Sequence, residues 1–150
     1  MVVKLASRRV GPRSRATLVA AECHQEAEAL FLTLIKESAE QHFHRAMITG
    51  WLSLAQIALR RGELAETAVR LQKADTLAQE FKHRRYIGEI HRVWSLVHIL
   101  RGNLPAARES LAEAIDLFER LAMRRELAEA QLALADLDAG AATSAATTRA

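Results

Sequence analysis

The sequence predicts an all-α fold of about six helices in one domain. Half of the 150 residues are hydrophobic and 26% are charged, which is typical of a folded domain. Two prolines and six glycines interrupt a chain rich in residues that favour helices. Apolar residues recur at helical spacing, and one segment returns after 40 residues. We therefore expect antiparallel helix-turn-helix units that stack on one another.

The repeat is clearest where Arg-Gly-Glu-Leu at residues 61–64 returns as Arg-Gly-Asn-Leu at 101–104. The same 40-residue offset continues along the helix that follows each segment. Leu71, Ala74 and Leu77 align with Leu111, Ala114 and Leu117, and Glu89 aligns with Glu129. This agreement indicates two copies of one structural unit.

Helix ends are marked by glycine and by a capping residue. Gly62 and Gly102 can take the positive φ that ends a helix. Asn103 is a suitable N-cap, and Pro105 then falls in the first turn, where its missing N–H costs little. We expect helices near residues 16–41, 45–60, 64–82, 85–100, 104–122 and 125–138.

The two flanks differ in composition from this helical domain of residues 16–138. Residues 1–15 carry five basic side chains and no acidic one, which predicts a disordered basic arm, although organelle transit peptides share that composition. Residues 139–150 are Ala, Thr, Gly and Ser with one Arg and lack a periodic apolar face. We expect them to form a disordered tail.

Charge and cysteine content exclude several classes of protein. The net charge is +3, but without the arm 16 basic residues face 18 acidic ones, so we do not expect nucleic acid as a partner. No apolar run approaches the roughly 20 residues of a transmembrane helix, so we expect no membrane partner. The single cysteine, Cys23, cannot form an intramolecular disulfide, which favours a cytoplasmic protein.

No motif in the chain predicts catalysis, a metal or a cofactor. The sequence lacks His-Glu-x-x-His, a glycine-rich phosphate loop and Gly-x-Ser-x-Gly. Cys23 and His24 are adjacent, so on a helix their side chains diverge by about 100° and cannot act together. His91 and His98 share a helical face, but a metal site needs three or four converging ligands. We expect a protein that is not an enzyme and binds no metal or cofactor.

Small and large apolar residues at these positions predict how the helices pack. Small residues would let the helix axes approach closely, and large ones would fill the space between layers. The small residues are Ala55, Ala74, Ala107 and Ala114, and the large ones are Leu54, Leu71, Trp94, Leu111 and Phe118.

Residues 51–74 resemble the tetratricopeptide repeat (TPR) family. They read Trp-x2-Leu-Ala-x2-Ala from residue 51, then a turn with Gly62, then Leu-x2-Thr-x3-Leu-x2-Ala from residue 64. The resemblance covers residues 25–138, but the family's closing proline is absent at Gln79 and Glu119. The 40-residue period and segment 117–126 are similar to the longer repeats of bacterial regulators, such as maltose-activator-type factors. That period also suits a HEAT-type helical array.

The resemblance implies a right-handed α-solenoid in which the first helices of successive units line a concave groove for a peptide or a partner's helix. Leucine and glutamine occupy the positions where the chaperone-binding subclass clamps a terminal carboxylate, so we predict no such clamp. The leucines of the groove set could instead pack against neighbouring helices. The implied groove residues are Thr49, Leu52, Gln56, Arg60, Glu89, Arg92, Leu96, Glu129, Leu132 and Asp136.

Three functions follow as hypotheses. The first is an adaptor or scaffold that binds a segment of another protein in the groove or through its exposed terminal helix. The second is an effector-sensing module of a bacterial transcription regulator, whose basic arm touches DNA. The third is a self-assembling scaffold, because the last helix carries leucines at 127, 132, 134 and 137 with no following helix to cover them.

Overall fold

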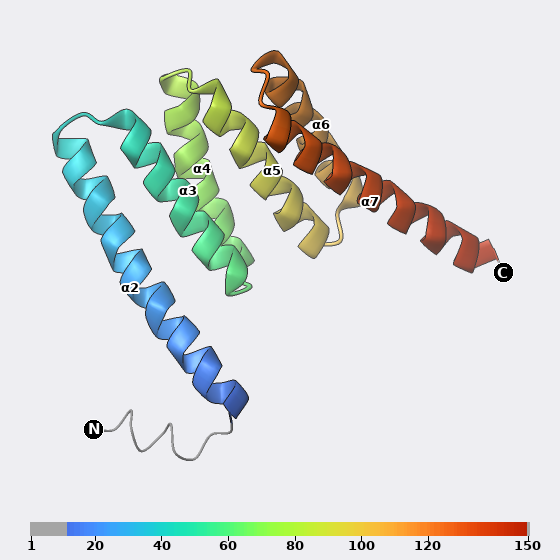
Figure 1. Ribbon diagram of the computed structural model, residues 1–150, viewed down its shortest axis with the longest axis horizontal. Coiled ribbons are helices and arrows are strands. Elements are labelled where there is room, and N and C mark those ends of the chain that lie inside the picture. Colours follow the sequence, from blue (N-terminus) through green and yellow to red (C-terminus); the bar gives the residue numbers. More distant parts are fainter. Residues whose placement is uncertain (1–11, 150) are drawn as a thin grey trace.

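The computed structural model describes residues 12–149, and the side chains of residues 23–143, as a series of six helices (Figure 1). Consecutive helices run in opposite directions and pack on one another in chain order. This arrangement confirms the predicted all-α class. The helices are α2 (Pro12–Glu40), α3 (His44–Arg60), α4 (Leu64–Glu80), α5 (Arg84–Leu100), α6 (Leu104–Arg120) and α7 (Arg124–Arg149).

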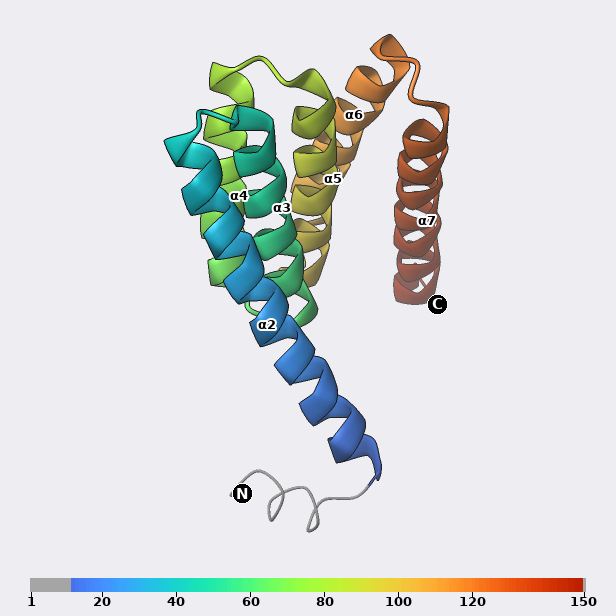
Figure 2. The ribbon, with the colours of Figure 1, turned by 60° about the vertical axis from the view of Figure 1, so that its left-hand side comes forward.

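The turns of the array lie at two opposite ends. The α2–α3, α4–α5 and α6–α7 turns share one end, and the α3–α4 and α5–α6 turns share the other (Figures 1 and 2). The contacts are most extensive within the α3–α4 and α5–α6 pairs, and α3 also touches α5. The predicted helix-turn-helix units are therefore the pairs α3–α4 and α5–α6. No helix of the described segment is long and apolar enough to cross a membrane.

The backbone repeats every 20 residues, which is half the period visible in the sequence. Helices α3 to α6 each have 17 residues, and every connecting turn contains one residue with positive φ. In the α3–α4 turn the Gly62 amide donates to the Leu59 carbonyl and the Glu63 amide donates to the Ala58 carbonyl, both at 3.0 Å. This Schellman pattern recurs in all five turns. The positive-φ residues are His42, Gly62, Lys82, Gly102 and Ala122.

The outer helices extend beyond the boundaries predicted for them. Helix α2 begins at Pro12 rather than near residue 16, and residues 1–11 of the predicted arm lie outside the described part of the chain. Helix α7 continues to Arg149, through most of the segment 139–150 that we expected to be a tail. Alanine accounts for the extension of α7, because it is the best helix former and needs no apolar face to continue a helix.

The core confirms the predicted roles of the small residues and of most large ones. The four alanines at 55, 74, 107 and 114 are fully buried, as are Leu54, Leu71, Leu111 and Phe118. Trp94 is the exception, because it is only half-buried and packs on the edge of the core.

Two glycines allow especially close contact between helices. A Cβ atom on Gly50 of α3 would lie 2.6 Å from Ile35 of α2, and one on Gly88 of α5 would lie 2.7 Å from the Phe118 ring of α6. Such distances are far inside van der Waals contact, so a larger residue would separate these helix pairs.

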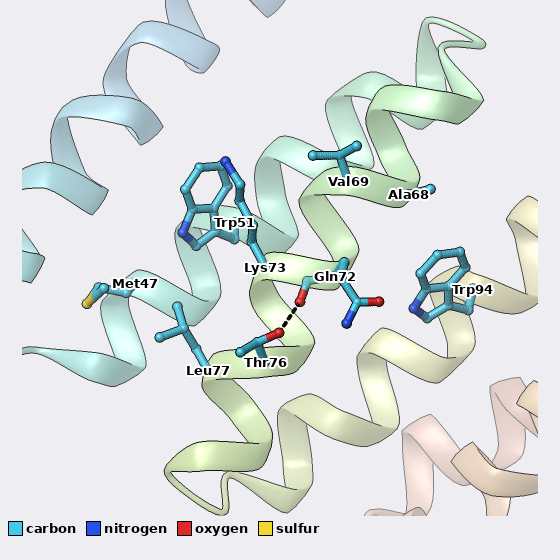
Figure 3. Close-up of a pocket in the computed structure, with 9 residues that line it drawn as sticks. All are labelled: Met47, Trp51, Ala68, Val69, Gln72, Lys73, Thr76, Leu77 and Trp94. Carbon is cyan, nitrogen blue, oxygen red and sulfur yellow. Dashed lines mark hydrogen bonds between the residues drawn. The ribbon is translucent and has the colours of Figure 1, made fainter.

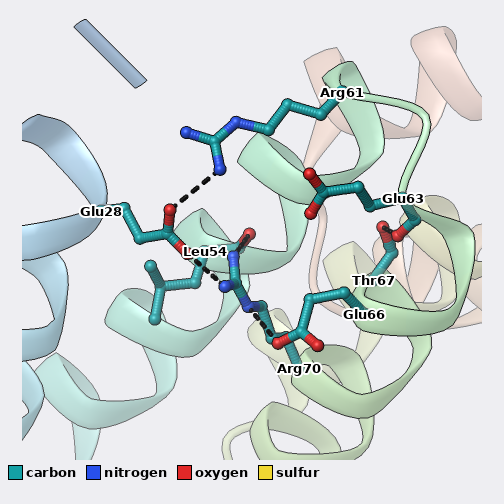
Figure 4. Close-up of polar contacts among 7 residues, drawn as sticks. All are labelled: Glu28, Leu54, Arg61, Glu63, Glu66, Thr67 and Arg70. Carbon is teal, nitrogen blue, oxygen red and sulfur yellow. Dashed lines mark hydrogen bonds and ion pairs between the residues drawn. The ribbon is translucent and has the colours of Figure 1, made fainter. Parts of the chain in front are cut away.

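Helix α2 is held against α3 and α4 by a network of ion pairs around Glu28 (Figure 4). Arg61 donates to Glu28 at 2.9 Å, and Arg70 donates to Glu28, to Glu66 at 2.9 Å and to the Leu54 carbonyl at 2.9 Å. Burial acts to raise the pKa of Glu28, but hydrogen bonds and charge from Arg70 and Arg61 lower the pKa below its ordinary value. The carboxylate is therefore stabilised in its ionised form.

Candidate functional site

An apolar depression lies on α3, α4 and α5, and we call it the tryptophan pocket (Figure 3). It has a volume of about 730 Å³ and contains both tryptophans of the chain. Its lining residues are Met47, Trp51, Ala68, Val69, Gln72, Lys73, Thr76, Leu77 and Trp94.

The two tryptophans reach the pocket from different helices. Trp51 comes from α3 and Trp94 from α5, and they lie on either side of α4 in Figure 3. Both side chains are half-buried and rest on the core cluster beneath them. The Trp94 ring also stacks on His98, with ring centroids 5.7 Å apart. These contacts hold one face of each indole in place and leave part of it accessible to a ligand.

The polar groups of the pocket are few and carry one positive charge. Lys73 lies over the Trp51 ring, with Nζ 4.3 Å from the ring centroid, a cation–π distance. The Thr76 hydroxyl donates to the Gln72 carbonyl of its own helix at 2.9 Å. No carboxylate of the described residues lines the tryptophan pocket. The surface can therefore hold apolar groups together with a negative charge beside Lys73.

Four of the groove residues implied by the resemblance meet between α3 and α5. Gln56, Arg60, Arg92 and Leu96 line a cavity of about 300 Å³ together with Leu59 and Val93. Leu96 remains 40% exposed there, so its apolar surface is accessible. Of the described side chains, two guanidinium groups and no carboxylate line this concave cavity.

One groove assignment is wrong. Leu52 is only 4% exposed and belongs to the core cluster with Ile48, Leu71 and Ile90. Its position on α3 turns it toward the neighbouring helices, as the alternative for the groove leucines anticipated. Leu52 therefore stabilises the fold and cannot touch a ligand.

Two further groove residues lie in the N-terminal halves of α3 and α5. Thr49 is exposed and its hydroxyl donates to the Arg45 carbonyl at 2.9 Å. Glu89 is half-buried and forms an ion pair with Arg85 at 3.4 Å. Neither residue lines the concave cavity of Gln56 and Leu96.

The remaining groove residues lie on α7 and do not line the concave cavity between α3 and α5. Glu129 pairs with Arg125 at 3.2 Å, Asp136 is exposed and Leu132 is 64% exposed. The structure thus brings together four of the ten predicted residues and separates the other six from them.

Sequence reasoning missed the tryptophan pocket because its residues have ordinary helical spacing. Trp51 was identified with the first position of a repeat, and Trp94 was expected to fill the interior. Nothing in the sequence marks Val69 as different from a core residue, and only the packing shows that it is 51% exposed.

Within the described residues, no group of three or more His, Cys, Asp or Glu side chains could hold a metal ion. Comparison with protein-family models, with curated proteins and with solved structures finds no match. The resemblance to the tetratricopeptide repeat therefore stays a prediction, and the function has to be argued from these surfaces.

Proposed function

We propose that this chain is a non-catalytic helical-repeat module that binds a segment of another protein. The observation that carries the proposal is that both tryptophans, each half-buried, line one apolar pocket of about 730 Å³. That volume lies within the roughly 300–1,000 Å³ of ligand pockets, and tryptophan is enriched among residues that dominate binding energy. The tryptophan pocket is thus the main docking surface in this proposal.

The chemistry of the pocket specifies its occupant. Trp51, Trp94 and Met47 offer flat and adaptable apolar surface, which fits aromatic or aliphatic anchors. Lys73 is the single charged residue of the lining, and an acidic side chain beside the anchors would complement it. The expected occupant is an amphipathic segment with apolar anchors and at least one acidic residue.

A peptide selection tests the proposal. Immobilised protein would be used to enrich peptides from a random display library, and binding would be followed by tryptophan fluorescence, which reports only on Trp51 and Trp94. We expect Val69→Glu to weaken the selected peptides about tenfold, because it places a charge at the edge of the apolar pocket.

The matched control is Leu96→Glu, which adds the same charge to the exposed part of the concave cavity. Circular dichroism would confirm that both variants are folded. Peptides that are lost with Leu96→Glu and kept with Val69→Glu would place the binding site in the concave cavity. A library that yields no binder would contradict the interaction module itself.

Self-association through α7 is the second candidate function. The exposure of Leu132 on this terminal helix favours it, since a copy of the chain could cover that side chain. Sedimentation of the wild type beside Leu132→Glu would separate this candidate from peptide binding. A concentration-dependent increase in size that only the variant loses would support self-association.

A further inference from the structure

The end of the array that carries the α2–α3, α4–α5 and α6–α7 turns contains a small, strongly basic cavity, which we call the basic end pocket. It has a volume of about 360 Å³ and draws on the start of α3, the α4–α5 turn and the start of α5. Its polar lining consists of Arg45, Lys82, His83, Arg84, Arg85 and Tyr86.

The positive charges of this pocket are only partly balanced. Arg45 Nε donates to the Tyr86 hydroxyl at 3.0 Å, and Arg85 pairs with Glu89 at 3.4 Å in an exposed ion pair. Lys82 and Arg84 have no ion-pair partner in the described part of the chain. Among the side chains that the structure describes, no carboxylate lines this pocket, so four permanent cations face one cavity.

The basic end pocket adjoins a second cavity of about 610 Å³. The two cavities share Arg45 and His83, and the second adds His42 and His44. Among the described residues, this second lining contains no carboxylate and no permanent cation besides Arg45. The permanent positive charge is therefore concentrated in the basic end pocket itself.

The start of α5 adds to this field. Helix α5 has no acidic residue in its first turn, and its N-cap, His83, makes no side-chain hydrogen bond to the helix. Arg84 and Arg85 occupy a helix N-terminus, where the helix dipole disfavours cations. An anion in the pocket would offset both the dipole and the mutual repulsion of the cations.

We propose that the basic end pocket binds a small anion with two or more adjacent phosphate groups. Guanidinium groups donate paired hydrogen bonds to phosphate oxygens, and Lys82 adds a point charge. The cations come from Arg45 of α3 and from the continuous stretch 82–85, and they line one compact cavity instead of following a long groove, which favours a small ligand over a polymer.

This inference does not rest on the proposed function, because the basic end pocket and the tryptophan pocket share no residue. Loss of phosphate binding would leave peptide selection unaffected. The two proposals can therefore fail separately.

Tyr86 offers a local readout because it is the only tyrosine of the chain. Burial acts to raise the pKa of Tyr86, but hydrogen bonds with Thr49 and Arg45, and the charges of Arg45 and Arg85, lower the pKa below its ordinary value. An anion that neutralises these arginines should raise the pKa of Tyr86 again. The ring-carbon NMR signal of isotope-labelled tyrosine, recorded through an alkaline pH titration, measures this change.

The test is a titration of the whole chain with sodium pyrophosphate at fixed salt, followed by the Tyr86 signal. We expect saturable binding that Arg84→Gln weakens about tenfold, since a hydrogen bond to a charged group is lost. Lys82→Gln is a second variant with the same expected direction. The matched control is Arg101→Gln at the opposite end of α5, which makes the same change of charge and should bind as the wild type.

Several outcomes would overturn the proposal. One is an unchanged Tyr86 signal at millimolar pyrophosphate, and another is equal weakening by Arg84→Gln and Arg101→Gln, which would indicate diffuse attraction. If a hexaglutamate peptide binds more tightly than pyrophosphate, the ligand of the pocket is an acidic protein segment and not a phosphate compound. A parallel titration with ADP shows which part of the ligand is recognised. Tighter binding of ADP than of pyrophosphate would indicate a nucleotide, and equal binding would indicate recognition of the phosphates alone.

Discussion

Helices α2 and α7 lie at opposite ends of the array, and different interactions hold them in place. Helix α2 is attached through Glu28, whose carboxylate accepts from Arg61 and Arg70 and is largely shielded from water. Helix α7 packs through a small apolar cluster in which Ala130 meets Phe118. Its ion pair to α6 is exposed, with Arg108 Nε 2.8 Å from Asp138. The attachment of α2 therefore includes a shielded, pH-dependent ionic contact beside the packing of Ile35 on Gly50, whereas the shielded contacts of α7 are apolar and centre on Phe118.

Helices α7 and α2 should therefore be loosened by different substitutions. A partly buried ion pair loses its stabilising effect when its carboxylate is protonated, whereas packing around a phenylalanine has no such dependence. Truncating the ring should loosen α7 with little effect on α2, and removing the Glu28 charge should do the reverse.

The largest expected effect is that of Phe118→Ala. Phe118 is fully buried, lies against Gly88 of α5 and belongs to the cluster that receives Ala130 of α7. Truncation should lower the free energy of unfolding by about 3–5 kcal/mol, because it leaves a cavity between three helices. Urea denaturation followed by circular dichroism measures this loss.

A matched control is Leu132→Ala on the exposed side of α7, which should change stability by no more than about 0.5 kcal/mol. If Phe118→Ala also costs less than about 1 kcal/mol, the ring does not hold α7, and the proposed difference between the two ends is contradicted.

The second effect in size is that of Glu28→Gln, which should cost about 1–3 kcal/mol because two guanidinium groups lose their charged acceptor. The folded-state pKa of Glu28 is lowered, so its contribution is present above the ordinary pKa of the group and is lost as pH falls through the folded value. Urea midpoints of wild type and variant should therefore converge as the medium becomes acidic. Limited proteolysis of α2 would locate the change. A difference that stays constant with pH would mean that the charge of Glu28 is not what attaches α2.

Sequence reasoning predicted the helices well because local pattern determines them. The apolar spacing and the glycines at 62 and 102 place the inner helix ends within about two residues of those observed, the usual uncertainty of a helix boundary. The 20-residue period stayed hidden because the other turns take positive φ at His42, Lys82 and Ala122. The backbone bonds of the Schellman turn are the same there, but the residue type gives no sign of them.

The site was less predictable because it depends on contacts between distant segments. Glu28 meets Arg61 and Arg70 across 33 and 42 residues, a pairing that no local spacing indicates. Leu52 and Leu96 are alike in sequence, yet one is buried and the other 40% exposed, because their burial depends on which helices pack around them. Residue type therefore predicted which side chains are apolar, and packing decided which of them a ligand can reach.

The smallest expected effect is that of Asp138→Asn, and it tests the comparison most directly because it removes the ionic contact of α7. The side chains of Arg108 and Asp138 are 43% and 57% exposed. We expect a loss of about 0–1 kcal/mol, since water already solvates both charges. Hydrogen exchange of the α7 amides should stay close to the wild-type pattern, while Glu28→Gln speeds exchange in α2. If Asp138→Asn released α7 as readily as Glu28→Gln releases α2, both outer helices would depend on ionic contacts, and Phe118 would then be a core residue with no special part in attaching α7.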